Sequence, residues 1–422
     1  MNIAVDKGFL RGEIEIISSK SVAHRVMICA AAANEQTVIK GLNNSADVFA
    51  TINCLTALGA EFQKDGDGVY KVTPIGDIKS RDDLKTLNCG ESGSTLRFLL
   101  PFAASLGVKA EFNTEGRLPE RPIEELIAVM EKNGASVIKK GAKIYVSGEL
   151  KSGDYRISAK VSSQFISGLL MALSRVKGGG RIILDGEAES EGYINITVDV
   201  MEKFGAKTHY DKGVYEVKGR GSYISSGIAE IEGDWSNAAF FIAAGILNGD
   251  IVLKGLNINS KQPDREIIDI IRRMGGKIEE RKDGIEVKKS CLHGTEIDVK
   301  NIPDLAPVLS VVAGLANGRT IMRNVERLRL KECDRLSAVA ETITKSGGRA
   351  VMEDSRLIID GVKEYKSAVL SGFNDHRMVM SAAILALGAS GTITINGTEA
   401  VNKSYPDFFE EYKRLGGKIC HL

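Results

Sequence analysis

The sequence predicts an α/β protein of two domains, built from six copies of one strand–helix–strand–helix–strand–strand unit. Three observations carry this prediction. Short stops of small residues recur at intervals of 69–75 residues, patterns of buried helices recur in phase with them, and 422 residues are too many for one core of ordinary size. Hydrophobic residues make up 43% and charged residues 26%, which is typical of a globular protein.

The first series consists of glycines that follow helix-like stretches. Glycine adopts the left-handed backbone conformation that ends a helix, so each stop has a physical reason. After each of the first five stops, two short strand-like runs flank a turn, as in AEFQKDGDGVYKV (60–72). The stops are LGA, NGA, FGA, MGG, SGG and LGG, centred on Gly59, Gly134, Gly205, Gly275, Gly347 and Gly416.

The second series consists of helices that are apolar nearly all round, each followed by a short β-branched strand. WSNAAFFIAAGILNGDIVLKG (235–255) is one example. A helix without a polar face is predicted to be buried rather than amphipathic. Each unit therefore places one buried helix and one outer helix between its strands.

The sixth unit stops short, because only KICHL remains after its glycine stop. NIAV (2–5) is predicted to supply the missing strand by returning beside the C-terminus. Both termini then belong to one domain. We expect a continuous first domain at residues 18–228 and a second domain at residues 1–17 plus 229–422.

The composition excludes several classes of partner. A net charge of +1 does not favour bulk attraction to nucleic acid or to an anionic membrane. The six cysteines form no CxxC pair and the histidines number five, which predicts neither a metal site nor a disulfide framework. No apolar run reaches membrane-spanning length, and the start lacks a signal-peptide pattern. We expect a cytoplasmic monomer that binds small anions through local basic clusters.

Residues suited to anions gather where the predicted buried helices begin. Helix N-termini present free N–H groups and positive dipole ends, so several together form an anion site. Plain helix capping explains the Ser and Asp residues equally well, and that alternative stays open for each of them. Capping does not explain adjacent cations, which favour phosphate or carboxylate ligands. The residues at these starts are Ser19, Lys20, Ser21, Arg25, Ser92, Gly93, Ser94, Arg97, Ser162, Ser163, Gln164, Asp304, Asp375, His376 and Arg377.

Three further runs combine basic and acidic residues. They are TEGRLPERP (114–122), ERLRLKECDRL (326–336) and NKSYPD (402–407). Each alone is typical of a solvated helix start, but together they suit a site for two anionic substrates. Their charged residues include Arg117, Arg121, Arg327, Arg329, Lys331, Glu332, Asp334, Arg335 and Lys403.

In this order, the motifs SKSVAHR, GESGSTLR, RLPERP, VSSQ, IPD, LKECDRL, NDHRM and KSYPDFF resemble those of the EPSP synthases, across essentially the whole chain. The resemblance implies two domains, each an inside-out α/β barrel of three βαβαββ repeats, with the active site in the cleft between them. It also implies transfer of the enolpyruvyl group of phosphoenolpyruvate to the 5-hydroxyl of shikimate 3-phosphate. That reaction proceeds by addition and elimination through a tetrahedral intermediate and needs no metal or organic cofactor.

The resemblance implies roles at the matching positions. Asp304 would accept the hydroxyl proton, Glu332 and Lys20 would serve proton transfer at C3 and the leaving group, and His376 would support them. Phosphoenolpyruvate is expected at Lys20, Gly93, Arg117, Gln164, Arg335, Arg377 and Lys403. Shikimate 3-phosphate is expected at Lys20, Ser21, Arg25, Ser162, Ser163, Gln164, Ser190, Tyr193, Asp304 and Lys331. Three positions depart from the usual family residues and receive no role: Glu91, Phe98 and Arg327.

Three other functions fit the sequence less well. The sister enzyme that uses UDP-N-acetylglucosamine normally has Lys-Asn near the start and often a Cys in the loop before the RP pair. Here Lys20 is followed by Ser21, and TEGRLPERP has no Cys. A phosphate binder without chemistry does not need Asp304, Glu332 and His376. A dinucleotide enzyme is disfavoured because KGGGR lacks the strand–GxGxxG–helix context.

Overall fold

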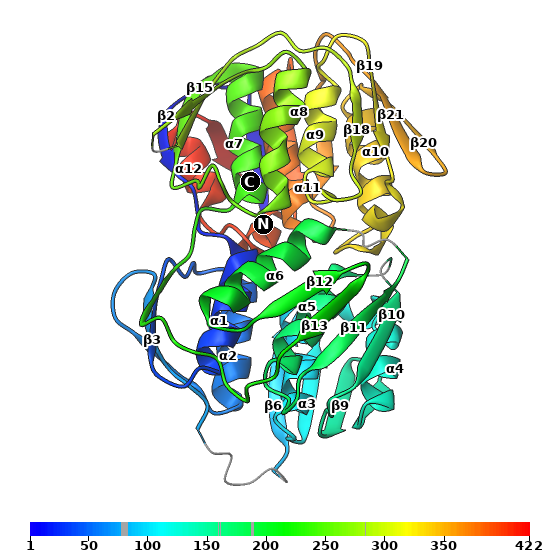
Figure 1. Ribbon diagram of the computed structural model, residues 1–422. Helices are drawn as coiled ribbons and strands as arrows, with labels where there is room; N and C mark the ends of the chain where they lie inside the picture. Colours follow the sequence, from blue (N-terminus) through cyan, green and yellow to red (C-terminus); the bar gives the residue numbers. More distant parts are fainter. Residues whose placement is uncertain (77–82, 159, 161, 187–189, 283) are drawn as a thin grey trace. The chain divides into compact units, whose positions relative to one another are not determined.

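Figure 1 shows the computed structural model of the chain. The structure describes residues 1–76, 83–158, 160, 162–186, 190–282 and 284–422. The chain divides into two compact units. The split unit comprises residues 1–17 and 233–422, and the continuous unit comprises residues 18–232. Each unit has a hydrophobic core of its own, so each is described separately.

Among the described residues, six four-stranded sheets share one topology, three in each unit. In each sheet the first two strands of the repeat are parallel, and the fourth strand lies antiparallel between the second and the third. Parallel neighbours need a crossover connection. In four repeats a buried helix connects the two parallel strands directly, and in the other two the first strand comes from a distant part of the chain. The predicted α/β fold of six βαβαββ repeats is therefore confirmed.

The continuous unit holds three of these repeats. The first comprises β14 (Ile228–Glu230), α1 (Lys20–Ala31), β3 (Thr37–Lys40), α2 (Ala46–Ala57), β4 (Glu61–Lys64) and β5 (Val69–Thr73). The second comprises β6 (Lys85–Gly90), α3 (Gly93–Ser105), β7 (Ala110–Thr114), the 3-10 helix η1 (Leu118–Glu120), α4 (Glu124–Lys132), β8 (Ala135–Lys140) and β9 (Lys143–Gly148). The third comprises β10 (Asp154–Ser158), α5 (Ser163–Leu173), β11 (Gly180–Asp185), α6 (Glu191–Lys203), β12 (Thr208–Asp211) and β13 (Val214–Val217).

The split unit holds the other three. Its first repeat comprises β2 (Leu10–Glu15), α7 (Trp235–Asn248), β15 (Gly249–Lys254), η2 (Pro263–Glu266), α8 (Ile267–Arg273), β16 (Lys277–Arg281) and β17 (Gly284–Lys288). The next comprises β18 (Glu296–Asp298), α9 (Ala306–Ala313), β19 (Arg319–Arg323), η3 (Glu326–Leu330), α10 (Arg335–Lys345), β20 (Arg349–Glu353) and β21 (Arg356–Asp360). The last comprises β22 (Ala368–Ser371), α11 (His376–Leu385), η4 (Ala386–Gly388), β23 (Ile393–Asn396), η5 (Thr398–Lys403), α12 (Phe408–Arg414), β24 (Lys418–His421) and β1 (Asn2–Asp6).

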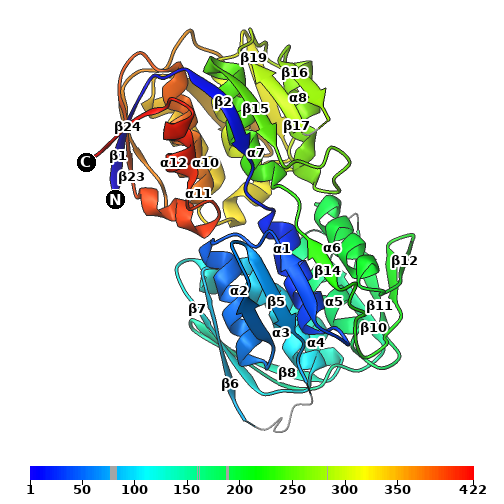
Figure 2. The same ribbon diagram turned by 90° about the vertical axis from the view of Figure 1, so that its left-hand side faces the viewer.

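Three strands complete sheets that are distant in sequence. β1 pairs antiparallel with both β23 and β24, so the predicted return of the N-terminus is confirmed, and Figure 2 shows both chain ends beside these strands. β2 directly precedes α1 in the chain but pairs in parallel with β15. β14 directly precedes α7 but pairs in parallel with β3. The chain thus exchanges first strands where it crosses from one unit to the other.

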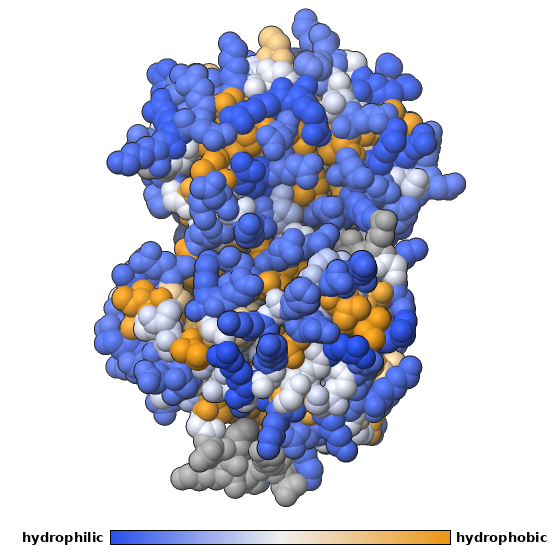
Figure 3. Space-filling model, viewed as in Figure 1, coloured by the Kyte–Doolittle hydropathy of each residue, from blue (hydrophilic) through white to orange (hydrophobic). Residues whose placement is uncertain are grey.

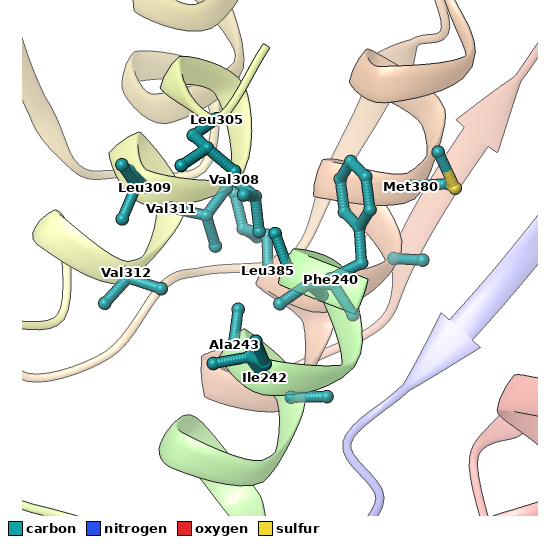
Figure 4. Close-up of a cluster of buried hydrophobic side chains, with 14 of the residues drawn as sticks. Phe240, Ile242, Ala243, Leu305, Val308, Leu309, Val311, Val312, Met380 and Leu385 are labelled. Atoms are coloured by element: carbon teal, nitrogen blue, oxygen red, sulfur yellow. The ribbon is translucent and has the colours of Figure 1, made fainter. Parts of the chain in front are cut away.

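The six helices predicted to be buried form the cores. They are α1, α3 and α5 in the continuous unit and α7, α9 and α11 in the split unit, and nearly all their residues are buried. Figure 4 shows Phe240 of α7, Val308 of α9 and Leu385 of α11 lying together in the split unit. In α1, α3 and α5 the residues that are not fully buried lie in the first turn, and they are Lys20, Ser21, Ser94 and Gln164.

The glycine stops behave as predicted. All six central glycines have positive φ, between 74° and 108°. A side chain there would strain the backbone, which explains why glycine recurs at each stop. On the face in Figure 3, hydrophilic residues dominate and hydrophobic ones form small groups. Among the described residues, no helix is both long and apolar enough to cross a membrane.

Candidate active site

Asp304 lies at the centre of a charged cluster in the split unit. Arg335 Nη1 lies 2.8 Å and Lys331 Nζ 3.2 Å from its Oδ1, and Arg377 Nη2 lies 3.1 Å from its Oδ2. Asp304 is in the turn before α9, whose N-cap is Leu305, so the capping explanation does not apply to it. Its position in the cluster is therefore explained by its cationic neighbours.

Arg335 ties this cluster to the starts of two helices. Its guanidinium is 1% exposed and donates through Nε to Asp375 Oδ2 at 2.7 Å and through Nη2 to Glu332 Oε2 at 2.7 Å. Asp375 is 0% exposed and caps α11 by accepting from Arg377 N at 2.9 Å. Three carboxylates, on Asp304, Glu332 and Asp375, thus meet three cations, on Lys331, Arg335 and Arg377. An added anion must share cations that carboxylates of the protein already contact.

The pKa shifts follow from this arrangement. Burial alone raises the pKa of Asp304, but Arg377, Lys331 and Arg335 together hold it well below its usual value. Burial lowers the pKa of Lys331, and Asp304 partly offsets that effect. Burial also acts to lower the pKa of Arg335, yet the carboxylates of Asp375, Glu332 and Asp304 raise it well above the usual value. Asp304 is therefore ionised at neutral pH, in the form that accepts a proton.

Arg377 and Lys403 are held by neighbouring elements of the split unit. Arg377 Nη2 donates to Ser236 Oγ at 2.9 Å, and that hydroxyl donates to Asp234, the N-cap of α7, at 2.5 Å. Lys403, at the end of η5, donates to the Asn374 carbonyl at 2.7 Å. Asn374 belongs to the loop before α11.

The loop before α11 carries backbone strain. Phe373 and Asn374 both have positive φ, 51° and 52°. Such a conformation costs roughly 1–3 kcal/mol per non-glycine residue and tends to occur at functional sites. This loop leads directly into Asp375, the N-cap of α11, and His376, its first residue. His376 is 2% exposed, and its Nδ1 lies 3.9 Å from Asp375 Oδ1.

A second cluster surrounds the start of α1 in the continuous unit. Lys20 is the first residue of α1, and its Nζ lies 2.7 Å from Asp47 Oδ2 of α2. Ser21 follows it, and its carbonyl accepts from Arg25 Nη1 at 2.6 Å. Ser19 caps the helix by accepting from Val22 N, so the capping explanation holds for this serine.

Arg25 is a buried cation with several hydrogen-bond partners. It is 2% exposed and donates to Thr197 Oγ1, Ser167 Oγ and the Tyr193 carbonyl in addition to Ser21. Burial lowers its pKa to about 9, so it stays charged at neutral pH. Its guanidinium carbon lies 4.8 Å from the ring centre of Phe98, one of the positions that depart from the usual family residue. Phe98 therefore makes a cation–π contact with Arg25.

The glycine loop before α3 forms a third group of candidate residues. Ser92 caps α3. A β-carbon on Gly93 would lie 3.0 Å from Arg121 Nη1 and 3.3 Å from Arg97 Nη1, so two guanidinium groups flank this glycine. Arg97 Nη1 donates to Gln164 Oε1 at 2.7 Å, and Gln164 Nε2 donates to Ser94 Oγ at 2.9 Å. Backbone N–H groups beside two arginines suit a phosphate.

The guanidinium of Arg121, the second arginine of RLPERP, is therefore one of the two that flank Gly93. Arg117 is 45% exposed, and its Nε lies 3.7 Å from Glu120. The two arginines are the residues directly before and after the 3-10 helix η1. The unusual Glu91 packs its carboxylate against Gly116, where a β-carbon would overlap it. Arg327 lies in η3, where its charge adds to those that lower the pKa of Lys331.

The remaining predicted residues lie at the starts of α5 and α6. Ser162 caps α5 by accepting from Gln164 N at 3.3 Å, and Ser163 is 5% exposed. Ser190 directly precedes α6 with a φ of 57° and is 2% exposed. Tyr193, in the first turn of α6, accepts from Arg25 through its carbonyl. The structure thus brings Arg25 together with Ser21 and Tyr193.

Sequence reasoning gave no role to Asp47, Arg121, Ser236 and Asp375, which contact the predicted residues directly. Asp375 and Arg121 stood inside recognised motifs, so only their roles were missed. Asp47 and Ser236 carried no signal, because their partners are distant in sequence. Among the described residues, no group of three or more His, Cys, Asp or Glu side chains is arranged to hold a metal ion.

Comparisons with known proteins show the family of this chain. A family profile described as EPSP synthase (3-phosphoshikimate 1-carboxyvinyltransferase) matches residues 6–412. A 3-phosphoshikimate 1-carboxyvinyltransferase of Clostridium novyi is 37% identical, covering 99% of this chain and 98% of that protein, and one of Clostridium acetobutylicum is 38% identical over 97% and 96%.

Solved structures show the same fold. An EPSP synthase structure from Acinetobacter baumannii has a TM-score of 0.82 at 24% identity and covers 100% of both chains. An enolpyruvyl transferase from Streptomyces tendae has a TM-score of 0.82 at 18% identity, covering 100% of this chain and 98% of that one. From the profile and the relatives together, the chain belongs to the EPSP synthase (3-phosphoshikimate 1-carboxyvinyltransferase) family.

Proposed function

We propose that this chain transfers the enolpyruvyl group of phosphoenolpyruvate to the 5-hydroxyl of shikimate 3-phosphate and releases phosphate. The observation that carries the proposal is the ionised Asp304, set among Lys331, Arg335 and Arg377 and one side chain away from Glu332. The reaction needs a base, an acid and cations, and this cluster supplies all three.

In the addition step, the Asp304 carboxylate takes the proton of the 5-hydroxyl while the oxygen attacks C2 of phosphoenolpyruvate. Glu332 or Lys20 gives a proton to C3, so a tetrahedral intermediate forms. In the elimination step a proton leaves C3 and the C2–O bond to phosphate breaks, which regenerates the enol double bond. His376 has a supporting role beside Asp375 in this proposal.

Substrate binding also restores the basicity of Asp304. In the ligand-free cluster three cations hold its pKa low, which makes it a weak base. When the carboxylate of phosphoenolpyruvate shares Arg335 and Arg377, each guanidinium divides its charge between two anions. The pKa of Asp304 then rises towards its usual value, at the moment when the hydroxyl proton must be accepted.

The anion contacts are assigned to both units. For phosphoenolpyruvate we propose Lys20, Gly93, Arg117, Gln164, Arg335, Arg377 and Lys403, and in addition Arg121, which flanks Gly93. For shikimate 3-phosphate we propose Lys20, Ser21, Arg25, Ser162, Ser163, Gln164, Ser190, Tyr193, Asp304 and Lys331. The buried Arg25 supports the serine and tyrosine positions through its backbone contacts.

The test is phosphate release from phosphoenolpyruvate, with shikimate 3-phosphate and UDP-N-acetylglucosamine offered as separate acceptors. We expect release with shikimate 3-phosphate alone, and loss of release in Asp304→Asn. Asp360→Asn, which alters an exposed carboxylate of the same unit, is the control. Release with the nucleotide sugar would assign the chain to the sister reaction, and no release with either acceptor would refute an enzymatic role. Sedimentation equilibrium tests the accompanying proposal that the chain is a monomer.

A further inference from the structure

The ion pair between Lys20 and Asp47 is shielded from water. Its side chains are 14% and 16% exposed, whereas those of Lys71 and Asp65, a pair of similar length in the same unit, are 39% and 50% exposed. Exposed pairs of this kind are weakened by solvent and by side-chain freedom. The Lys20–Asp47 pair is therefore the better restrained of the two.

A buried contact one helical turn below fixes the register of the same two helices. His24 Nδ1 lies 2.7 Å from Thr51 Oγ1, and both side chains are 0% exposed. Lys20 to His24 and Asp47 to Thr51 are both steps of four residues, so each helix presents both contacts on one face. Figure 2 shows α1 and α2 side by side. The lower contact thus sets Asp47 opposite Lys20.

Asp47 is also placed independently of Lys20. Asn43 Nδ2 donates to the Ser18 carbonyl at 2.9 Å, and Asn43 Oδ1 accepts from Ser45 N at 3.0 Å. These bonds tie the turn before α2 to the residues before α1. Asp47 lies in the first turn of α2, where the helix dipole favours a carboxylate. The carboxylate is therefore a fixed reference point for a flexible lysine.

We propose that Asp47 is a positioning residue for Lys20, one that sets the direction of the ammonium group toward phosphoenolpyruvate without touching the substrate. The inference rests on the proposed function. A lysine ammonium sits on a flexible four-carbon stem, so without a partner it samples many directions. Proton transfer and leaving-group assistance need one direction, and Asp47 selects it.

The test is Asp47→Asn, which keeps the size of the side chain and removes its charge. We expect kcat/KM for phosphoenolpyruvate to fall about 10- to 100-fold, the loss typical of a misplaced catalytic group. Asp47→Glu, which keeps the charge, should retain more activity than Asp47→Asn. Asp65→Asn removes the exposed matched pair and should change kcat/KM less than about twofold.

A double-mutant cycle separates positioning from a general structural role. In a Lys20→Met background, Asp47→Asn should cost nothing further, because the group that it positions is gone. An equal cost in both backgrounds, or unchanged kcat/KM in Asp47→Asn alone, would overturn the proposal. If Asp47→Asn does not fold, Asp47→Ala in the two backgrounds gives the same comparison, because it also removes the carboxylate. If the wild-type chain itself released no phosphate, the proposed function would be refuted instead. That outcome is measured first, on the wild type alone.

Discussion

Two arginine–aspartate pairs of the split unit have the same geometry and opposite environments. In each pair Nε lies 2.7 Å from one carboxylate oxygen and Nη2 lies 3.3 Å from the other. Arg335 and Asp375 are 1% and 0% exposed, whereas Arg319 and Asp360 are 60% and 37% exposed. Replacing each aspartate by asparagine therefore isolates the effect of burial.

The expected costs differ severalfold. Breaking a buried ion pair from one side costs about 3–5 kcal/mol, because the remaining charge is left uncompensated. Asp304 and Glu332 still contact the Nη1 and Nη2 atoms of Arg335, so we expect the lower end, about 3 kcal/mol, for Asp375→Asn. Asparagine still caps α11, so capping contributes little to this difference. An exposed pair contributes about 0–1 kcal/mol, which is the cost expected for Asp360→Asn.

Calorimetry of the two variants measures the difference. For a unit of roughly 200 residues, 1 kcal/mol shifts Tm by about 2–4 °C. Asp375→Asn should lower the Tm of the split unit by about 6–12 °C and Asp360→Asn by at most about 4 °C. Equal shifts in the two variants would refute the reasoning, because they would show that burial of the Arg335 pair adds nothing to its energy.

Three further predictions follow from the site. Arg117→Gln and Arg121→Gln should each raise the KM for phosphoenolpyruvate about tenfold or more in steady-state assays, because a charge-assisted contact with the substrate is lost. Asp304→Asn should lower kcat about 10²- to 10⁴-fold. The cationic neighbours of Asp304 outweigh its burial and keep its pKa in the folded state below the unfolded value. The wild-type chain should therefore lose stability as the pH falls below about 4. Circular dichroism should show a flatter acid transition for Asp304→Asn than for the wild type. Burial, and after it the charges of Lys20 and Arg25, hold the pKa of His24 well below 6.5. The free energy of unfolding of the wild type should therefore decrease below about pH 6.5, by up to about 1.4 kcal/mol per pH unit. Denaturant unfolding of His24→Asn between about pH 5 and 8 should lack this slope.

Much of the fold could be predicted because its signals are local and repeated. Each of the central glycines of the stops, such as Gly59 and Gly416, is required by a left-handed backbone conformation at its own position. The burial of the apolar helices could be predicted because they lack a polar face. The return of β1 followed from counting strands, since the last repeat lacked one.

The candidate site was predictable where residue type and position suffice. Asp304 stood out at the start of a predicted buried helix, and Glu332 and Arg335 stood out in a run of mixed charge. The structure joins all three within one cluster. The capping alternative also proved correct for Ser19, Ser92 and Ser162, since an N-cap depends only on the first turn of its own helix.

Other features depended on distances that no local pattern encodes. The repeat, its glycine stops, its buried helices and the residue types of the site follow from local patterns in the sequence. The exchange of β2 and β14 between sheets, the position of Arg121 beside Gly93 and the contact of Asp47 with Lys20 became visible only in the folded units. The physical reason is that backbone propensity and capping act within a few residues, whereas strand pairing and ion pairing between elements are set by the packing of the whole unit.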